Sequence, residues 1–506
     1  MRSEDSANEA HPAVGLISSR IAVLTLLFSI ATIWESGRLA SLADPAIWGH
    51  LRMGSWILEN RRLPQAGLFS QASHAPWMDF PWGFDLLAAV AYRALGLRAM
   101  PALLMALRVG LAGISFLLGG GLRGNFWLGL VVSALTQYLF LGLGPGPAFV
   151  SMIFFGVQLL VLMESRRRRD HRMLFWLPAL FFVWANFDNE FLYGIAMLCL
   201  FLLVLSVEGV GRRRRWQWLD VPETGMRVPL AFAVGGLSFL TTLLTPYTFN
   251  SYIAFFSAET SSLNRHLPGY AAMSFRQPQD YVLMLLLMAA LFSMGRQRSR
   301  DVFLLALLGG CAVLSFHALR VNWLLTIASA AVIGEMNPGE REKVSEERRG
   351  RVWRSHLLAP AGLAIVLAVF ALAIRVPRNR ETLLAKTGEH FPVRACDYIR
   401  EHRLPEPLFN SYLWGNFLTW YLPEYPVAID FRRGLYPDEE ESNYFKVMNA
   451  ELPYQALPSL QRAGTLLLER GTVMAEALET MPGFQVAYQD EISLVLLHES
   501  LETKAR

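Results

Sequence analysis

The chain has 506 residues, of which 53% are hydrophobic and only 17% are charged, and its mean hydropathy is +0.31. Soluble globular proteins carry more charge, so this composition predicts an integral membrane protein. Its 3 cysteines are too few and too scattered for a disulfide scaffold or a cysteine-based metal site. The net charge of +4 does not indicate a nucleic-acid partner, because most basic residues lie between apolar segments.

Apolar segments recur along the first three quarters of the chain. A membrane-spanning helix needs about 20 mostly apolar residues. Eleven segments approach that length: 14-34, 101-119, 126-142, 148-163, 173-186, 191-209, 228-245, 281-295, 302-316, 320-335 and 355-375. They predict a polytopic α-helical membrane protein.

The loops between these segments differ sharply in basic content. Lys and Arg are retained on the cytoplasmic side of a membrane. The loops 119-125, 164-172, 210-227, 296-301 and 336-354 carry 20 basic residues. The opposite short loops, 143-147, 187-190, 246-280 and 317-319, carry 2. The N-terminus is therefore expected in the cytoplasm and the C-terminus outside.

The segment 82-98 is apolar enough for a further span, but counting it as one would place the basic run 166-169 outside. We expect it instead to lie along the outer surface as an amphipathic helix that turns Asp85 and Arg93 toward water. A membrane domain over 1-375 then carries external loops at 35-100 and 246-280. Residues 376-506 would form an external domain.

This C-terminal segment alternates between strand-like and helix-like runs, which predicts a small α/β layer structure. The expected strands are 407-410, 427-430, 465-468, 485-488 and 492-497, and the expected helices are 392-402, 412-421, 440-449 and 472-480.

The first external loop begins with Asp44, followed by His50 and Arg52. A carboxylate just outside a membrane helix can serve as a general base toward a substrate whose head group lies at the interface. The alternative is that Asp44 only caps the N-terminus of a short surface helix.

Several motifs along the chain resemble one known group of membrane enzymes. They are the run from Asp44 to Leu58, then Pro64, Phe69-Ser70, Pro76-Trp77, Trp82 and Asp85, then Trp184 to Asn186, Thr245 to Tyr247, Arg320, Phe409 to Gly415, Ile429 to Arg432, and Tyr436. Together they resemble bacterial members of the GT-C superfamily, the glycosyltransferases that use polyprenyl-phosphate-linked sugars. The closest subset is a poorly characterised group with a similar C-terminal domain.

This resemblance implies an activity and a location. It implies that Asp44 is the catalytic carboxylate, supported by His50, Arg52, Asp79 and Asp85. The expected reaction is inverting transfer of a hexosyl or pentosyl group from a polyprenyl-phosphate sugar to a glycan, lipid or protein acceptor. The expected place is the outer face of a bacterial cytoplasmic membrane, with the C-terminal domain in the periplasm or outside the cell.

The chain departs from the related pattern at three places, one of which is Asp188-Asn189-Glu190, where the relatives often carry His-Gly after Trp-Ala-Asn. Ala46 stands where a second acidic residue is usual, and Phe80-Pro81 stands where His-Glu is usual. Either the site has been rebuilt with Asp79, Asp188 and Glu190, or catalysis has been lost. The second case predicts a GT-C-like scaffold that binds a lipid-linked glycan or a partner protein.

The turn at Asp188 and Glu190 offers oxygen ligands of the kind that Mg²⁺ or Mn²⁺ binds, although a polar turn with a helix cap fits the same residues. A transporter is disfavoured, because the spans carry few ionisable residues and a large external domain follows them.

The donor phosphate requires cations near outer helix ends. Arg320 is the first candidate and Arg265 and His266 are the next, with interfacial snorkelling as the alternative. In the C-terminal domain, Asp430 and Arg432 are candidates for acceptor binding, or an ion pair that only fixes a loop.

Overall fold

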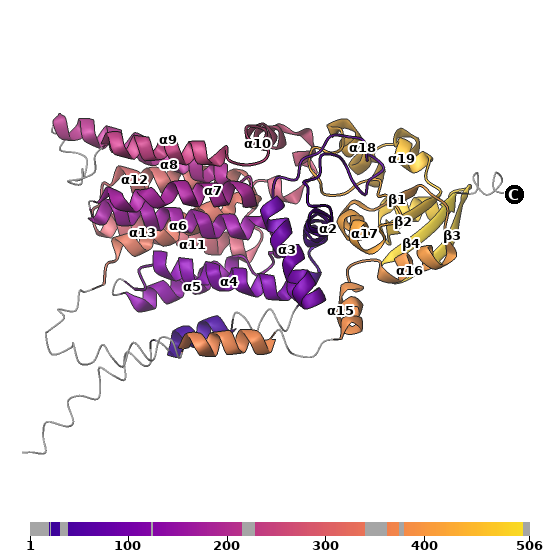
Figure 1. Cartoon of the computed structure of the whole chain (residues 1–506), viewed down its shortest axis with the longest axis horizontal. Helices are drawn as coiled ribbons and strands as arrows, with labels where there is room; N and C mark the ends of the chain where they lie inside the picture. Colours follow the sequence, from indigo (N-terminus) through magenta and orange to yellow (C-terminus); the bar gives the residue numbers. More distant parts are fainter. Residues whose placement is uncertain are drawn as a thin grey trace, which may run out of the picture.

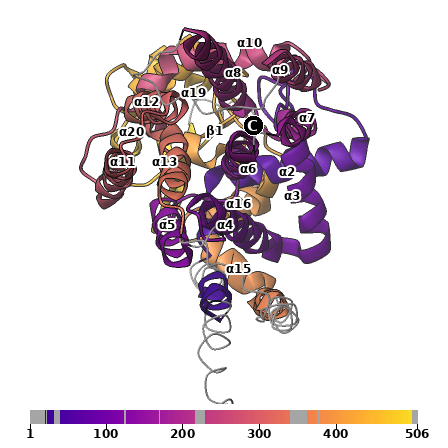
Figure 2. The ribbon, with the colours of Figure 1, turned by 90° about the vertical axis from the view of Figure 1, so that its left-hand side faces the viewer.

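The computed structural model describes residues 20, 22–30, 39–122, 125–168, 170–214, 228–339, 362–373 and 379–498. Long helices lie side by side in one bundle, and a smaller α/β part lies at one end of it (Figure 1). Seen along the bundle, α6 is central (Figure 2), and it contacts α4, α7, α8 and α13.

The bundle helices follow the expected segments closely. They are α4 (Ala99–Leu118), α5 (Phe126–Leu139), α6 (Pro147–Arg168), α7 (Leu177–Phe187), α8 (Phe191–Arg213), α9 (Val228–Thr242), α11 (Pro278–Arg296), α12 (Val302–His317) and α13 (Asn322–Met336). Five helical segments are long and apolar enough to cross a membrane, namely Trp82–Leu118, Pro147–Arg168, Phe191–Gly211, Pro278–Arg296 and Leu319–Met336. Four shorter apolar helices accompany them, including Gly362–Ala373. The chain is a multi-pass membrane protein.

Two helices of the first external loop, α2 (Pro45–Asn60) and α3 (Trp82–Leu95), cross the end of the bundle (Figure 1). The 3₁₀ turn Gly96–Arg98 separates α3 from α4, and Gly96 has a φ of 60°, which a residue without a Cβ adopts readily. A Cβ on Gly54 of α2 would lie 1.9 Å from the Asp85 carbonyl oxygen, so the two helices pack backbone to backbone.

The helix expected within 82-98 is present as α3, but the orientation of Asp85 differs from the expectation. Arg93 is exposed as expected, whereas Asp85 is only 1% exposed. Asp85 lies on the face of α3 that packs against α2, together with the buried Phe84, Ala88 and Ala89. The amphipathic pattern identified the helix correctly, but α2 covers the side that was assigned to water.

The C-terminal part contains a four-stranded sheet in the order β1-β2-β4-β3. Its strands are β1 (Leu408–Asn410), β2 (Thr465–Glu469), β3 (Phe484–Gln489) and β4 (Ser493–His498), and only the β1–β2 pair is parallel. Its helices are α15 (Arg380–Thr387), α16 (Val393–His402), α17 (Gly415–Tyr421), α18 (Asp438–Met448), α19 (Pro458–Gln461) and α20 (Val473–Glu479).

Both faces of this sheet are covered, because alternate residues of β2 enter different cores. Leu466 and Leu468 join the local core of the C-terminal part, while Leu467 joins the core that continues into the membrane bundle. Trp48 of α2 belongs to the core that contains Leu467, and its ring centre lies 5.4 Å from that of Phe417. The sheet is thus fixed to the first external loop by apolar packing.

The strand expected at 427-430 is absent from the sheet. Val427 instead pairs with the first external loop: its N–H donates to the Phe69 carbonyl at 3.0 Å, and its carbonyl accepts from the Gln71 N–H at 2.9 Å. Ser70 Oγ also lies 2.9 Å from Tyr436 Oη. A short apolar run has the composition of a strand, but here its hydrogen-bonding partner is a loop far away in the sequence.

Candidate active site

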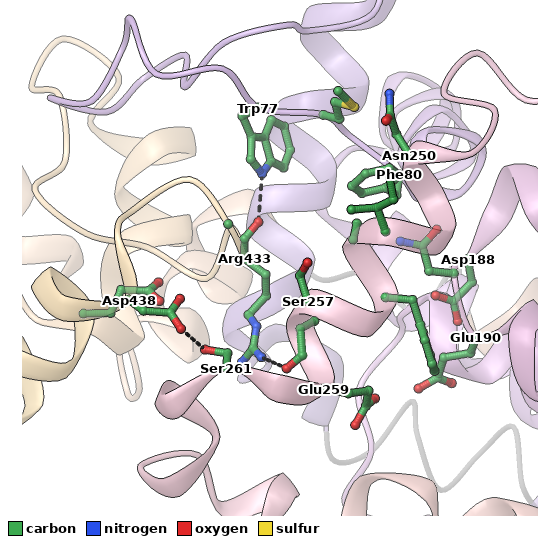
Figure 3. A pocket seen from close by; sticks show the side chains of 18 of the residues that line it. Trp77, Phe80, Asp188, Glu190, Asn250, Ser257, Glu259, Ser261, Arg433 and Asp438 are labelled. Carbon is green, nitrogen blue, oxygen red and sulfur yellow. Dashed lines mark hydrogen bonds between the residues drawn. The ribbon is translucent and has the colours of Figure 1, made fainter.

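Two adjoining chambers lie between the bundle end and the C-terminal part. The first, of about 340 Å³, is lined by α2, α17 and the 77–81 loop, and we call it the α2 chamber. The second, of about 550 Å³, is lined by α10 (Asn250–Thr260), the 188–190 turn and Arg320, and we call it the α10 chamber (Figure 3). Both are lined by Trp77, Met78, Phe80, Asn189 and Arg433.

One face of α2 forms a wall of the α2 chamber, because Ala46, Gly49, His50 and Met53 recur at helical spacing. His50 Nδ1 lies 2.7 Å from Asp85 Oδ1. Burial lowers the pKa of His50, against the opposing effects of Asp79, Asp44 and Asp188. Four carboxylates therefore surround or contact one imidazole.

Asp79 is 1% exposed, and its Oδ2 has no hydrogen-bond partner among the described residues. Burial raises the pKa of Asp79 well above its ordinary value, and the neighbouring Asp85 carboxylate raises it further. Two carboxyl groups this close do not both ionise at neutral pH. The pair can therefore offer a carboxylic O–H as a hydrogen-bond donor to a bound molecule.

Asp44 caps α2, as the simpler interpretation of the sequence proposed. Its Oδ1 accepts from the Ala46 N–H at 2.7 Å. Burial raises the pKa of Asp44, while the Ala46 N–H and His50 act in the opposite direction. Oδ2 is not used by this bond, but it faces Gly144, and Asp44 lines neither chamber.

The 188–190 turn joins α7 to α8. Asp188 Oδ2 accepts from Ser151 Oγ at 2.6 Å. Burial and the nearby Asp188 raise the pKa of Glu190 to about 8, although Arg320 lowers it. Across the described ranges no three His, Cys, Asp or Glu side chains are grouped so as to hold a metal ion.

Arg320 lines the α10 chamber and forms ion pairs with two carboxylates there. Its Nη1 lies 3.5 Å from Glu190 Oε1, and its Nη2 forms an ion pair with Glu259. Nη2 also donates to Tyr193 Oη at 3.0 Å. Two carboxylates thus compensate this guanidinium before any ligand arrives.

Arg433 is the cation that lines both chambers, and sequence reasoning missed it. Its Nη2 donates to the Ala258 carbonyl at 3.0 Å and to Asn264 Oδ1 at 2.7 Å. Both acceptors are neutral, and none of the ion pairs between described residues includes Arg433. Figure 3 shows it between Trp77 and Ser261. The only signal in the sequence was its position beside Arg432.

The other expected cations lie elsewhere. Arg265 is exposed, and His266 stacks on Phe445 with ring centroids 5.4 Å apart; neither lines a chamber. Arg52 does not line one either, and its guanidinium covers the Phe69 ring at 4.0 Å.

Asp430 and Arg432 form a buried ion pair. Arg432 Nε lies 2.9 Å and Nη2 2.6 Å from Asp430 Oδ2, and Asp430 is fully buried. Arg432 Nη1 donates to the Leu68 carbonyl, and the guanidinium lies 5.4 Å from the centre of the Trp77 ring. The pair ties the C-terminal part to the first external loop, and Arg432 contributes a wall of the α2 chamber.

No protein-family profile and no curated protein sequence matches the chain. Among solved structures, it is similar to the oligosaccharyltransferase of Archaeoglobus fulgidus in the apo form, with a TM-score of 0.52, 10% identity, and coverage of 89% of this chain and 69% of that one. The chain therefore shares the fold of this oligosaccharyltransferase. ArnT from Cupriavidus metallidurans bound to undecaprenyl phosphate is also similar, with a TM-score of 0.49, 12% identity, and coverage of 96% of this chain and 98% of that one. At this level of sequence identity only the fold is shared, so the activity has to be argued from the residues.

Proposed function

We propose that the protein transfers a sugar from a polyprenyl-phosphate donor to an acceptor hydroxyl at the outer face of a bacterial cytoplasmic membrane. The observation that carries the proposal is a buried group of carboxylates around His50, beside two chambers that share the cation Arg433. Sugar transfer from a phosphate donor needs a base and a cation on opposite sides of one reacting carbon.

We assign the donor to the α10 chamber. Its walls include Ile253, Ala254 and Phe255 of α10, and it lies where α8 begins next to Arg320. An apolar wall at the end of membrane helices suits a lipid carrier, while Arg433 suits its phosphate. The acceptor then occupies the α2 chamber, under Asn416 and Phe431 of the C-terminal part.

In this assignment the acceptor hydroxyl reaches past Ala46, at the wall of the α2 chamber, to Asp44, which takes its proton. That oxygen forms a bond to the anomeric carbon while the bond from this carbon to the phosphate oxygen breaks. The polyprenyl phosphate leaves with the bonding electron pair, and Arg433 and Arg320 face its charge. Inversion at the anomeric carbon follows from the single displacement.

Asp44 suits the base better than its neighbours. A buried base needs an ionised form at working pH together with a raised pKa. Burial raises the pKa of both carboxyl groups and His50 lowers both, but the Ala46 N–H further favours ionised Asp44, whereas Asp85 further opposes ionisation of Asp79. Asp79 and Asp85 are assigned to hydrogen bonding with a sugar hydroxyl.

A divalent cation remains a separate proposal, with Asp188 and Glu190 as its ligands. These carboxylates would hold Mg²⁺ or Mn²⁺ near the donor phosphate, and substrate oxygens would have to complete the shell. Donor turnover measured with EDTA, and after Mg²⁺ or Mn²⁺ is returned, tests this. Full turnover in EDTA would rule the metal out.

The basic residues support the orientation expected from the sequence. Arg166, near the end of α6, pairs with Asp301 and with Glu208, which lies near the end of α8; α8 begins at the α10 chamber, so these residues lie at the other end of the bundle. We propose that this end is cytoplasmic and that the C-terminal part is external. A membrane-impermeant thiol reagent should then label Arg462→Cys, which lies on the C-terminal part, in intact cells. Labelling only after lysis would reverse the orientation.

The direct test of function is incubation of the purified protein with radiolabelled polyprenyl-phosphate sugars and a membrane-lipid extract as the source of acceptor. The proposal predicts that the protein releases polyprenyl phosphate and transfers the radiolabelled sugar to an acceptor. Tight binding without release would favour the scaffold, in which Phe80-Pro81 reflects lost catalysis.

A further inference from the structure

A basic groove lies outside both chambers, at the elbow between α3 and α4 where α15 approaches it (Figure 1). The groove holds about 790 Å³. Its charged lining comprises Arg93 of α3, Arg98 of the elbow, and Arg380 and Glu381 of α15. Even without Arg98, the two cations Arg93 and Arg380 face one carboxylate. We propose that this groove binds the phosphate head group of an anionic diacyl phospholipid.

The charge of the groove calls for an anion. Among the residues that the structure describes, no ion pair joins Arg93 or Arg380 to a carboxylate. Both side chains are exposed, so neither is needed to compensate a buried acid. Like charges that gather in one concavity repel one another, and a bound anion relieves this repulsion.

The surroundings of the groove require an amphiphile rather than a small ion. On α3, Leu87 is 41% exposed, Val90 51% and Leu95 39%, so the helix presents an apolar edge beside the arginines. The apolar helix Gly362–Ala373 precedes α15 by a few residues, which places α15 at the level where a membrane helix ends. An apolar edge next to basic side chains is the pattern that binds anionic lipid surfaces.

This groove is separate from the two chambers in which we propose the transfer reaction. None of its lining residues lines either chamber. A phospholipid bound there would hold α3 and α15 together at the membrane surface. Because α3 carries Asp85, lipid occupancy would stabilise the helix that positions His50.

The test measures lipid affinity of the purified full-length protein by native mass spectrometry, with phosphatidylglycerol and phosphatidylcholine as probes. A basic residue near an anionic surface contributes about fivefold in affinity. The double variant Arg93→Gln/Arg380→Gln should therefore bind phosphatidylglycerol roughly thirtyfold more weakly. Glu381→Gln should bind it about fivefold more tightly, since it removes the opposing charge.

The matched control is Arg394→Gln, an exposed arginine on α16 that does not line the groove, and its affinity should not change. Unchanged affinity in the double variant would overturn the proposal. So would equal binding of phosphatidylcholine, tight binding of inorganic phosphate alone, or displacement of phosphatidylglycerol by polyprenyl phosphate at much lower concentration. Failure of sugar transfer would leave these affinities, and this proposal, unaffected.

Discussion

The carboxylate of Asp44 rests directly against Gly144. A Cβ on Gly144 would lie 1.8 Å from Asp44 Oδ2. The other carboxylate oxygen, Oδ1, accepts a hydrogen bond from the Ala46 N–H. Asp44 is thus held from one side by its own helix and from the other by the turn between α5 and α6. Only glycine leaves room for this carboxylate.

Gly144→Ala should therefore move Asp44 and impair transfer without altering any charged group. A misplacement of about 1 Å can cost about a hundredfold in rate, so we expect a loss of that order in kcat. Gly146→Ala in the same turn is the control, because nothing lies within 4 Å of its new Cβ. Equal activity of the two variants in the donor-release assay would mean that the position of Asp44 does not matter.

Arg433→Gln should lower turnover by about 10² to 10³, the usual effect of removing one donor that faces developing negative charge. Arg433→Lys should recover part of the lost turnover, because the lysine ammonium restores the positive charge but not the second nitrogen of the guanidinium fork. Arg462→Gln, an exposed change in the same C-terminal part, serves as the control. Normal donor release by Arg433→Gln would remove Arg433 from the mechanism.

The Asp430–Arg432 pair should act through stability. Arg432→Met leaves a fully buried carboxylate without its cation, which typically costs about 3–5 kcal/mol of the free energy of unfolding. The double variant Asp430→Asn/Arg432→Met should lose less, because no charge is left uncompensated. Thermal unfolding of the wild type, Arg432→Met, Asp430→Asn and the double variant measures the coupling. Additive losses, or a raised acceptor KM at normal stability, would point to acceptor binding instead.

Stability should fall as the pH rises, in part through Glu190. Its pKa is about 8 in the folded protein and 4.5 ordinarily, so between these values the folded state holds more protons than the unfolded state. Raising the pH through this window therefore favours unfolding. Glu190→Gln should flatten the decrease in Tm between pH 5 and pH 8, whereas Glu439→Gln, an exposed change on α18, should not. An identical decrease in both variants would contradict this.

The membrane helices could be predicted from the sequence because the physics there is simple. A backbone in lipid must satisfy its own hydrogen bonds, so each apolar segment of sufficient length becomes a helix. The helix α3 was also predicted from its apolar pattern. The burial of Asp85 did not follow, because it depends on the close approach of Gly54 in α2.

The candidate site could be predicted only in part from the sequence, for the same reason. Asp44, His50, Asp79 and Asp188 could be named, but their gathering around His50 depends on long-range packing of α2 against α3 and the 188–190 turn. Arg432 and Arg433 look alike in sequence. Asp430 forms an ion pair with Arg432, and Arg433 is then available to line both chambers.

The central claim is most directly tested by donor turnover in Asp44→Asn, with the purified protein in nanodiscs and a radiolabelled polyprenyl-phosphate sugar. Asn caps a helix as well as Asp does, so α2 should persist. Asp170→Asn changes another capping aspartate, whose side chain accepts from the Arg172 N–H, and controls for loss of charge at a cap. The account predicts that Asp44→Asn binds donor normally and loses about 10² to 10⁴ in release of polyprenyl phosphate, while Asp170→Asn is unaffected. Release at the wild-type rate by Asp44→Asn would contradict it.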